Sequence, residues 1–495
     1  MIRFSETVPL VLTPLTPIHI GCGEDFEPTN YVIDNGVLYG FEPSRLGLTS
    51  EDRERLIQCA DRAADAAVRG VQQFFHERRH QCRAISHLAL PVAIGVAQRY
   101  ERRIGQVAQR ESGGRTVINR LEIERTAHHP YSGKPYLPGS SIKGSARTAW
   151  LNAMDNIPPI RCNPGQPPRK SASDLEKEIL GGSFVSDPFR LVEFADAAGA
   201  DLKSRVVFAV DRRKSDGKEN NVAIREVIVA GQHRAAQGEI RFKMRPPSSD
   251  PSHAPRVEKC IGDFAVLARA CNRFYRRRLE VDLEVLTGLG ETQWAEAFRS
   301  LIATLKPALD EGRAMLLRVG RHSGAESVTL ERHRWIRIME GPGKAHWAHD
   351  ATTIWLAADR EDARTGLRLF GWLLLERADD LLAEDTLSRW CAAEKTTPAE
   401  TSRVAEGSDE PTRGPRHAPD EMVWPQARLQ YNRQNGTLTA FGPQNTRATA
   451  LGPRGTELFT SLPADVQRRI QSNPYSVRVV ARVRGPELLA VELGS

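Results

Sequence analysis

Prolines divide this chain at positions that no regular element can easily cross. Residues 155–173 and 245–256 are rich in proline, which lacks a backbone N–H and clashes with the preceding helical turn. A third stretch, 395–420, is rich in Pro, Thr, Ser, Glu and Gly and poor in apolar residues, a composition typical of flexible linkers. We therefore expect several folded pieces, about two to four domains for a chain of this length.

Between these breaks, the hydrophobic patterns of strands and helices alternate. Asn35-Gly36 predicts a tight hairpin within 31–41, and a second Asn-Gly pair predicts a hairpin within 427–441. Long parallel βα units are missing from the pattern, so the predicted fold class is α+β. Further strands are predicted at 8–24 (a strand that runs into a glycine loop), 205–211, 225–231, 238–244, 314–319 and 475–493, and helices at 50–83, 257–285 and 291–306.

The bulk composition narrows the class of protein. The formal net charge is +7 and the pI is about 9.1, which permits binding to a polyanion without proving it. No apolar run approaches membrane length and no signal peptide is visible, so we expect a cytoplasmic protein that contacts no membrane. Seven cysteines without a CxxC pair predict reduced thiols, no metal and no cofactor. They are Cys22, Cys59, Cys82, Cys162, Cys260, Cys271 and Cys391.

The stretch PYLPGSSIKGSARTAW, residues 135–150, predicts a glycine turn followed by a helix. Ser140 or Ser141 is a natural N-cap after Gly139. Lys143 and Arg147, on either side of Gly144, are four residues apart and share a polar face. Free N–H groups, the positive helix end and two cations favour an anion such as phosphate. An ordinary helix cap with solvated charges is the alternative, and the stretch matches neither the P-loop nor the dinucleotide pattern.

Two other glycine loops follow predicted strands and carry a histidine. The first holds His19, Gly21 and Gly23, and the alternative for it is a satisfied histidine beside a tight turn. The second, GRHSG, also carries arginines, which neutralise phosphates, while its glycines let a nucleic-acid backbone approach closely. Its candidate residues are Arg318, Gly320, Arg321, His322 and Gly324.

Several segments together resemble the RAMP superfamily of CRISPR systems. They are TPIHIGCGEDFEPTNYVIDNGVLYGFEP (16–43), PYLPGSSIKGSARTA (135–149), LRVGRHSGAESVT (317–329) and GWLLLE (371–376). Their order and spacing are similar to those of the fifth subunit of the type III-A Csm effector complex, over roughly residues 8–380. The linker and the residues after it look additional, so the resemblance says nothing of their role.

The resemblance implies tandem ferredoxin-like (RRM-like) domains with helical insertions. The expected division is 1–250 for the first domain with its helical insertion, 251–394 for the second, 395–420 for the linker and 421–495 for a small β-rich module. The family caps the 3′ part of the CRISPR RNA (crRNA) at one end of a ribonucleoprotein filament and is not regarded as catalytic.

The implied partners are therefore crRNA, with target RNA as a second candidate, and other Csm subunits, especially the backbone RAMP subunit and the small subunit. RNA contacts are expected at the helix start and both glycine loops. Those residues are His19, Gly21, Gly23, Gly139, Ser140, Ser141, Lys143, Gly144, Arg147, Arg318, Gly320, Arg321, His322 and Gly324.

Two other functions stay open at this stage. A RAMP-type endoribonuclease that processes CRISPR RNA would use a histidine such as His19 or His128 as general acid or base. No partner acid or base is positioned by the sequence, so no catalytic residue is predicted, and His128 and His129 are interpreted as loop residues. An anion-binding metabolic enzyme would instead need a small-molecule pocket.

Overall fold

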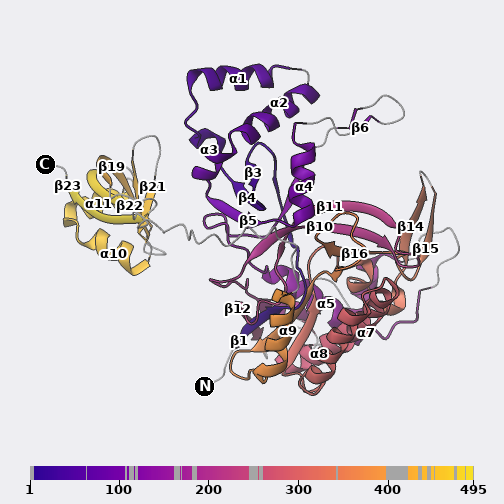
Figure 1. The fold of residues 1–495 in the computed structure, drawn as a ribbon. Helices are drawn as coiled ribbons and strands as arrows, with labels where there is room; N and C mark the ends of the chain where they lie inside the picture. Colours follow the sequence, from indigo (N-terminus) through magenta and orange to yellow (C-terminus); the bar gives the residue numbers. More distant parts are fainter. Residues whose placement is uncertain are drawn as a thin grey trace. The chain divides into compact units, whose positions relative to one another are not determined.

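The computed structural model of this 495-residue chain divides into two compact units, Met1–Val404 and Ala405–Ser495 (Figure 1). The predicted boundary at residue 250 and nearly all of the predicted linker, 395–420, lie outside the described residues. The structure describes residues 5–62, 64–105, 109–110, 116–117, 121–160, 168, 170–180, 187–244, 255, 260–341, 344–396, 422–432, 437–442, 447–450, 452–472, 477–484 and 487–493.

A five-stranded antiparallel sheet forms the centre of the first unit. Its order is β13 (Ala314–Arg318), β18 (Trp372–Arg377), β1 (Ser5–Pro14), β12 (Ala236–Lys243) and β9 (Val192–Phe194). Nearly every residue of β18 is buried, as expected for a central strand covered on both faces. Strands from both predicted domain ranges, 1–250 and 251–394, therefore share this one sheet.

A second sheet has six strands and belongs to the same hydrophobic core. Its order is β17 (Arg368–Leu369), β16 (Thr353–Ala358), β10 (Ser204–Arg213), β11 (Glu219–Ile228), β8 (Ile123–Thr126) and β2 (Gly21–Phe26). All neighbours are antiparallel except β11 and β8. β1 and β2 follow each other in the chain but lie in different sheets, so the segment between them connects the two.

Helices cover the five-stranded sheet where β13 lies. α7 (Phe264–Gly288) packs against α8 (Thr292–Glu311), β13 and α5 (Gly139–Met154). The helices α5, α7 and α8 are visible at the lower right of Figure 1. The prediction that α8 ends before Pro307 is wrong, because its buried stripe continues through Ala308 and Leu309. Three other helices of this unit are α4 (Ile94–Arg103), α6 (Ala172–Leu180) and α9 (Glu384–Thr396).

The predicted helix 50–83 is three helices, α1 (Ser50–Ala60), α2 (Ala64–Glu77) and α3 (Arg79–Ala84). They have a small hydrophobic cluster of their own with β3 and β4. The predicted hairpin at 31–41 is confirmed, with Asn35 and Gly36 at positive φ. The remaining strands of this unit are β3 (Tyr31–Asp34), β4 (Val37–Gly40), β5 (Leu88–Pro91), β6 (Gln109–Arg110), β7 (Thr116–Val117), β14 (Ile336–Gly341) and β15 (Lys344–Ala348).

The second unit is a closed five-stranded barrel with its own core. Its strands are β19 (Met422–Asn432), β20 (Thr437–Phe441), β21 (Arg447–Ala450), β22 (Arg478–Arg484) and β23 (Glu487–Leu493). They close in the order β19-β20-β21-β23-β22, with β21 and β23 parallel. The helices α10 (Gly452–Thr460) and α11 (Ala464–Ser472) lie between β21 and β22. This order and helix placement are those of the Greek-key OB-fold barrel.

The predicted α+β class is confirmed by this mixture of sheets and helices. The finer tandem ferredoxin-like arrangement stays a prediction. No helix in the described part of the chain is long and apolar enough to cross a membrane.

Candidate nucleic-acid interface

Helix α5 begins earlier than a serine cap would place it. Pro138 is the N-cap residue and Gly139 is the first residue of the helix. The prediction that Ser140 or Ser141 caps α5 is therefore wrong, because both serines lie inside the first turn. Ser140 is exposed there and Ser141 is half-buried.

An internal carboxylate already occupies part of the positive end of α5. The Gly139 N–H donates a 2.7 Å hydrogen bond to Oδ1 of Asp196, which the helix dipole favours. A Cβ at Gly139 would lie 2.2 Å from the carbonyl oxygen of Phe194. Glycine is thus required because β9 passes so close to the helix start, and the Gly139 N–H is not available to a phosphate in this arrangement.

The two cations of α5 differ in their surroundings. Arg147 donates to Asp187 from Nε (3.1 Å) and Nη2 (2.8 Å), and its Nη1 lies 3.1 Å from Glu176. Although burial opposes it, these carboxylates raise the pKa of Arg147. Lys143 forms no ion pair with a described carboxylate, and burial lowers its pKa despite the nearby Asp187. Lys143 is therefore the cation of α5 that can still accept an outside anion.

Arg318 lies in the core and not at the surface where a phosphate contact was expected. Its side chain is 2% exposed, and its guanidinium pairs with Asp282 and donates to the Phe370 carbonyl at 2.9 Å. Burial lowers the pKa of Arg318, while Asp282 opposes that shift. In this position Arg318 supports the GRHSG loop from the interior of the protein.

His19 is also fully buried. Its Nδ1–H donates to the carbonyl oxygen of Glu226 at 2.7 Å, and Nε2 lies 3.5 Å from Oε1 of Glu124. Burial lowers the pKa of His19, so the neutral imidazole is favoured at neutral pH. The alternative of a satisfied histidine is met at Nδ1 only, because the buried Nε2 has no hydrogen-bond partner among the described residues.

His322 is a second neutral histidine in the same region. The centroid of its ring lies 4.5 Å from that of the Trp355 ring and 5.1 Å from that of the Phe370 ring. Burial, followed by the charge of Arg225, lowers its pKa to about 3. Arg225 donates from Nε to Nε2 of His322 at 3.4 Å, so His322 acts as an acceptor here and not as a cation toward RNA.

Three segments far apart in the sequence meet at this place, which we call the three-segment junction (residues 18–21, 139–147 and 318–324). The Arg321 N–H donates to the His19 carbonyl at 2.8 Å. The Ser145 hydroxyl donates to the Arg318 carbonyl at 2.7 Å. Gly320, at φ +80°, lets the loop approach, since a Cβ there would lie 2.3 Å from the His19 oxygen.

The other glycines of the predicted site serve different purposes. A Cβ at Gly21 would lie 2.8 Å from the Glu124 carboxylate, whereas Gly144 has open space. Gly23 and Gly324 have positive φ. Of the predicted site residues, Ser140, Gly21, Gly23, Gly144, Arg321 and Gly324 have exposed surface.

Glu124 and Arg225 contact the junction but were not predicted. They are register partners on β8 and β11, and Arg225 Nη2 lies 3.1 Å from Glu124 Oε2. Glu124 also pairs with Arg321, whose side chain is 57% exposed. The sequence marks neither residue, because no motif or turn signal distinguishes these polar positions within β8 and β11.

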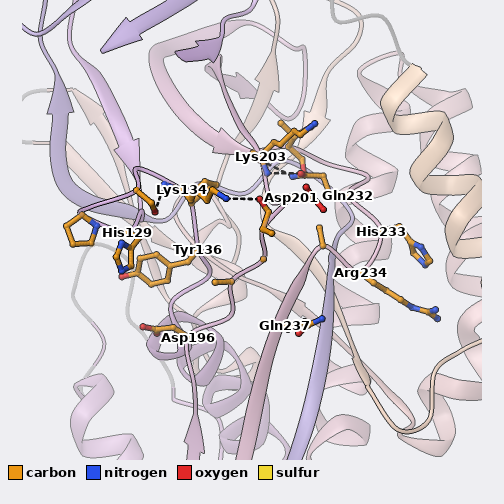
Figure 2. A pocket seen from close by; sticks show the side chains of 18 residues that line it. His129, Lys134, Tyr136, Asp196, Asp201, Lys203, Gln232, His233, Arg234 and Gln237 are labelled. Atoms are coloured by element: carbon orange, nitrogen blue, oxygen red, sulfur yellow. Dashed lines mark hydrogen bonds between the residues drawn. The ribbon is translucent and has the colours of Figure 1, made fainter. Parts of the chain in front are cut away.

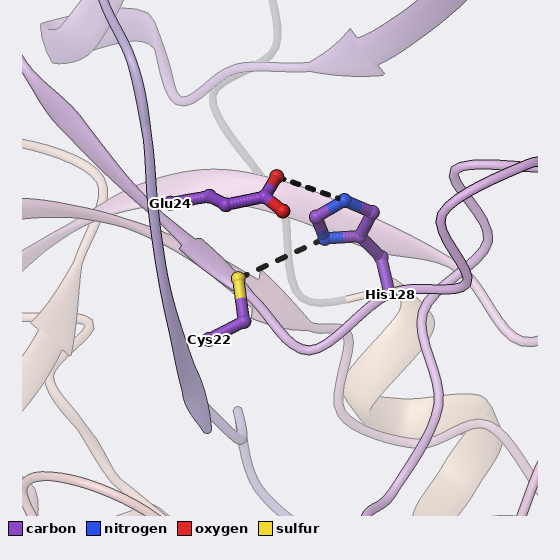
Figure 3. A group of neighbouring side chains, drawn as sticks. All are labelled: Cys22, Glu24 and His128. Carbon is purple, nitrogen blue, oxygen red and sulfur yellow. Dashed lines mark hydrogen bonds and ion pairs between the residues drawn. The ribbon is translucent and has the colours of Figure 1, made fainter.

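Cys22, Glu24 and His128 form a cluster with the donor types of a zinc site (Figure 3). However, Cys22 Sγ faces Nδ1 of His128 at 3.9 Å while the Glu24 carboxylate faces Nε2 at 3.4 Å. The guanidinium of Arg125 lies 3.6 Å from the same carboxylate, and burial raises the pKa of the Cys22 thiol. A cation would have to displace that positive charge and reorient the thiol, so this is not a preformed metal site.

A cavity of about 1190 Å³ opens beside the start of α5 (Figure 2). Its wall includes Asp196, the carboxylate that binds the Gly139 N–H. Lys134 and Lys203 also line it, and Lys134 donates to the Ala200 carbonyl at 3.2 Å. The volume suits a small molecule, but carboxylates stand among the lysines, so the wall is not selective for an anion.

Comparisons with known proteins give one matching family and a set of similar structures, of which two are described. The family model described as the RAMP superfamily matches residues 11–258. One similar structure is a chain from a cryo-EM structure of a Csm–crRNA–target RNA ternary complex of a type III-A CRISPR–Cas system. It is 15% identical with a TM-score of 0.44, over 75% of this chain and 100% of that one.

The other structure is crystalline Csm5 from T. onnurineus, also 15% identical, with a TM-score of 0.40. The match covers 73% of this chain and 99% of that chain. Among curated proteins, no sequence matches this one.

Proposed function

The chain belongs to the RAMP superfamily, and from this premise we propose that it is a non-catalytic crRNA-binding subunit of a type III-A CRISPR effector complex. In this role it caps the filament at the 3′ side of crRNA and supports maturation of the guide in antiviral defence. Its partners are crRNA, the backbone RAMP subunit and the small subunit, with target RNA as a further ligand. The resemblance of residues 8–380 to the fifth Csm subunit supports this assignment.

The observation that carries the proposal is the three-segment junction. The segments that hold the superfamily resemblance are separated by more than a hundred residues, yet two hydrogen bonds join them, from Ser145 to Arg318 and from Arg321 to His19. Local sequence patterns without a common purpose would have no reason to converge. Their convergence fits a surface on which a single ligand spans all three.

The groups proposed to contact RNA are those that face outward at this junction. Lys143 and Arg321 supply charge, and Ser140 and Gly144 supply an open surface on the first turns of α5. Arg147, Arg318, His19 and His322 support these groups from within. Contacts of this kind bind phosphates and carry no direct base information, which suits a protein that must accept guides of every sequence.

The endoribonuclease alternative is weakened by the position of His19. A general acid or base must come within hydrogen-bond reach of the proton that it transfers, but the His19 side chain is 0% exposed.

The tandem ferredoxin-like division at residue 250 is also part of our proposal. In this division β1 of the first domain shares one sheet with β13 and β18 of the second.

Purification of the tagged chain from cells that express the whole CRISPR operon tests the proposal. We expect the other type III-A subunits and a guide RNA to co-purify, with guide RNA that varies in spacer sequence. Recovery of the chain alone, free of guide RNA, would contradict it. As a test for catalysis, metal-free incubation with repeat-containing RNA should leave the RNA intact; specific cleavage lost in His19→Ala would favour the endoribonuclease.

A further inference from the structure

The barrel of the second unit has a marked excess of basic over acidic side chains. Residues 422–493 contain nine arginines, no lysine and four carboxylates, a formal net charge of +5 out of +7 for the whole chain. The remaining 421 preceding residues are therefore nearly balanced. The excess is confined to the barrel, since residues 405–421 of the same unit contain two arginines and five carboxylates. A small basic module of this kind fits a polyanion-binding surface.

Three of the residues on the outside of the barrel form one row across neighbouring strands. Arg478 on β22 is the register partner of Arg428 on β19, and Arg428 is the partner of Phe441 on β20. Both arginines are exposed and Phe441 is half-buried, while the adjacent Ala427 and Val479 point into the core. We call Arg428, Arg478 and Phe441 the arginine row.

The arginine row is an unfavourable arrangement for the barrel alone. Like charges directly opposite each other on paired strands are destabilising. Arg478 donates to the amide oxygen of Gln426 at 3.0 Å, but neither arginine pairs with a carboxylate in the described part of the chain. A barrel selected only for stability would gain from a carboxylate at either position, so the row indicates a ligand that is absent from the isolated chain.

The chemistry of that ligand follows from the three side chains. Two neighbouring guanidinium groups suit successive phosphates, and an aromatic ring beside them offers a stacking surface for a base. A base can stack on protein only when it is free of its own helix, so a single strand fits and a duplex does not. OB-fold barrels bind oligonucleotides on the face of their second and third strands, here β20 and β21, and the arginine row reaches that face through Phe441 on β20.

We propose that the outer face of β22, β19 and β20 is a binding surface for single-stranded RNA. Phosphates bind Arg428 and Arg478, and a base stacks on Phe441. The surface is separate from the three-segment junction and lies on a unit that the superfamily match does not reach. Only the choice of RNA over DNA rests on the proposed function.

The test uses the full-length chain and a fluorescein-labelled 12-nucleotide oligo-uridine, with anisotropy followed across a salt titration. Arg428→Gln with Arg478→Gln should flatten the log–log salt slope by about 1.4, because each lost phosphate contact is worth about 0.7 on a single strand. Phe441→Leu keeps the apolar volume and should weaken binding about fivefold. The matched control, Arg454→Gln with Arg468→Gln, removes the same charge from exposed positions on α10 and α11 and should keep most of the affinity.

A charge reversal separates binding from folding. Arg428→Glu places a carboxylate opposite Arg478, so the melting temperature should stay the same or rise while RNA affinity falls. Equal losses in the row and control variants, or tighter binding of oligo-thymidine than of oligo-uridine, would overturn the proposal. Failure of the proposed function would look different, since the chain would lack guide RNA in cells although the row still bound oligo-uridine.

Discussion

The arginines of the three-segment junction and those of the barrel differ in what neutralises them. Arg147, Arg318 and Arg321, which superfamily-like patterns contain, each have a carboxylate partner in the first unit. Arg428 and Arg478, which no pattern singles out, have none among the described residues. An arginine within a family-like sequence pattern can therefore stabilise the fold instead of binding RNA. Whether its guanidinium has a carboxylate partner distinguishes the two roles.

The largest effect is expected on breaking the buried pair of Arg318 and Asp282. Arg318→Ala leaves a 1% exposed carboxylate whose remaining ion pair among the described residues is with Arg278, which should cost about 3 kcal/mol. Arg321→Gln breaks the pair of a 57% exposed side chain and should cost less than about 1 kcal/mol. Urea denaturation of both variants measures the difference. Equal costs would show that burial does not distinguish these arginines.

Two glycines of α5 sharpen the comparison within a single helix. Gly139→Ala would force a Cβ to within 2.2 Å of the Phe194 oxygen, so the helix start must move, at about 2 kcal/mol. Gly144→Ala meets nothing within 4 Å and should stabilise the helix by up to about 1 kcal/mol. Thermal melts of the two variants should therefore shift in opposite directions, and a shift in the same direction would contradict the packing described for β9.

Because of His322, we expect the stability of the three-segment junction to depend on pH. The stability of the barrel should not show this dependence. The pKa of His322 is lowered to about 3 from an ordinary 6.5 by burial and by Arg225. Folding thus favours the neutral form of His322. The resulting contribution to the free energy of unfolding is fully present above pH 6.5 and is lost as the pH falls toward 3. The loss is about 1.4 kcal/mol per pH unit, or about 2 kcal/mol between pH 6.5 and 5.

His322→Asn is the matched variant, because asparagine tolerates the positive φ of 66° at this position. Its stability, measured by urea denaturation, should fall less between pH 6.5 and 5 than that of the unmodified chain. An unchanged pH profile would mean that the ring is reached by solvent and protonated without cost.

The parts of the fold that local sequence decides were predicted, and the parts that distant contacts decide were not. The 31–41 hairpin follows from the turn preference of Asn35-Gly36. The pairing of β1 with β18, in contrast, joins residues more than 350 positions apart, and no local pattern contains it. The predicted helix 50–83 breaks because α1 and α2 pack against each other, a tertiary demand that its helical periodicity does not record.

The candidate site shows the same division. Residue types and glycine positions singled out three segments as candidate RNA contacts, and these segments meet at the junction. They did not show which charges face inward, because burial of Arg318 depends on Asp282 in α7, and the pairing of Arg147 depends on Asp187, forty residues later. Glu124 lies at the site because the register of β8 against β11 places it opposite Arg225.

The smallest predicted effect tests which cation of α5 faces RNA. Lys143 has no ion pair with a described carboxylate, so Lys143→Gln should remove about one phosphate contact and flatten the log–log salt slope of guide binding by about 0.7. Its stability should barely change, because a half-exposed charge without a pair contributes little. Arg147→Gln removes the same charge four residues away but breaks the pair with Asp187. It should therefore lower stability by about 1–3 kcal/mol and leave the salt slope unchanged.

The two variants are compared by salt-dependent binding of several unrelated guides, since a phosphate contact should affect all guides alike. If Arg147→Gln changes the slope and Lys143→Gln does not, RNA displaces the internal carboxylates, and the assignment of roles within α5 is reversed.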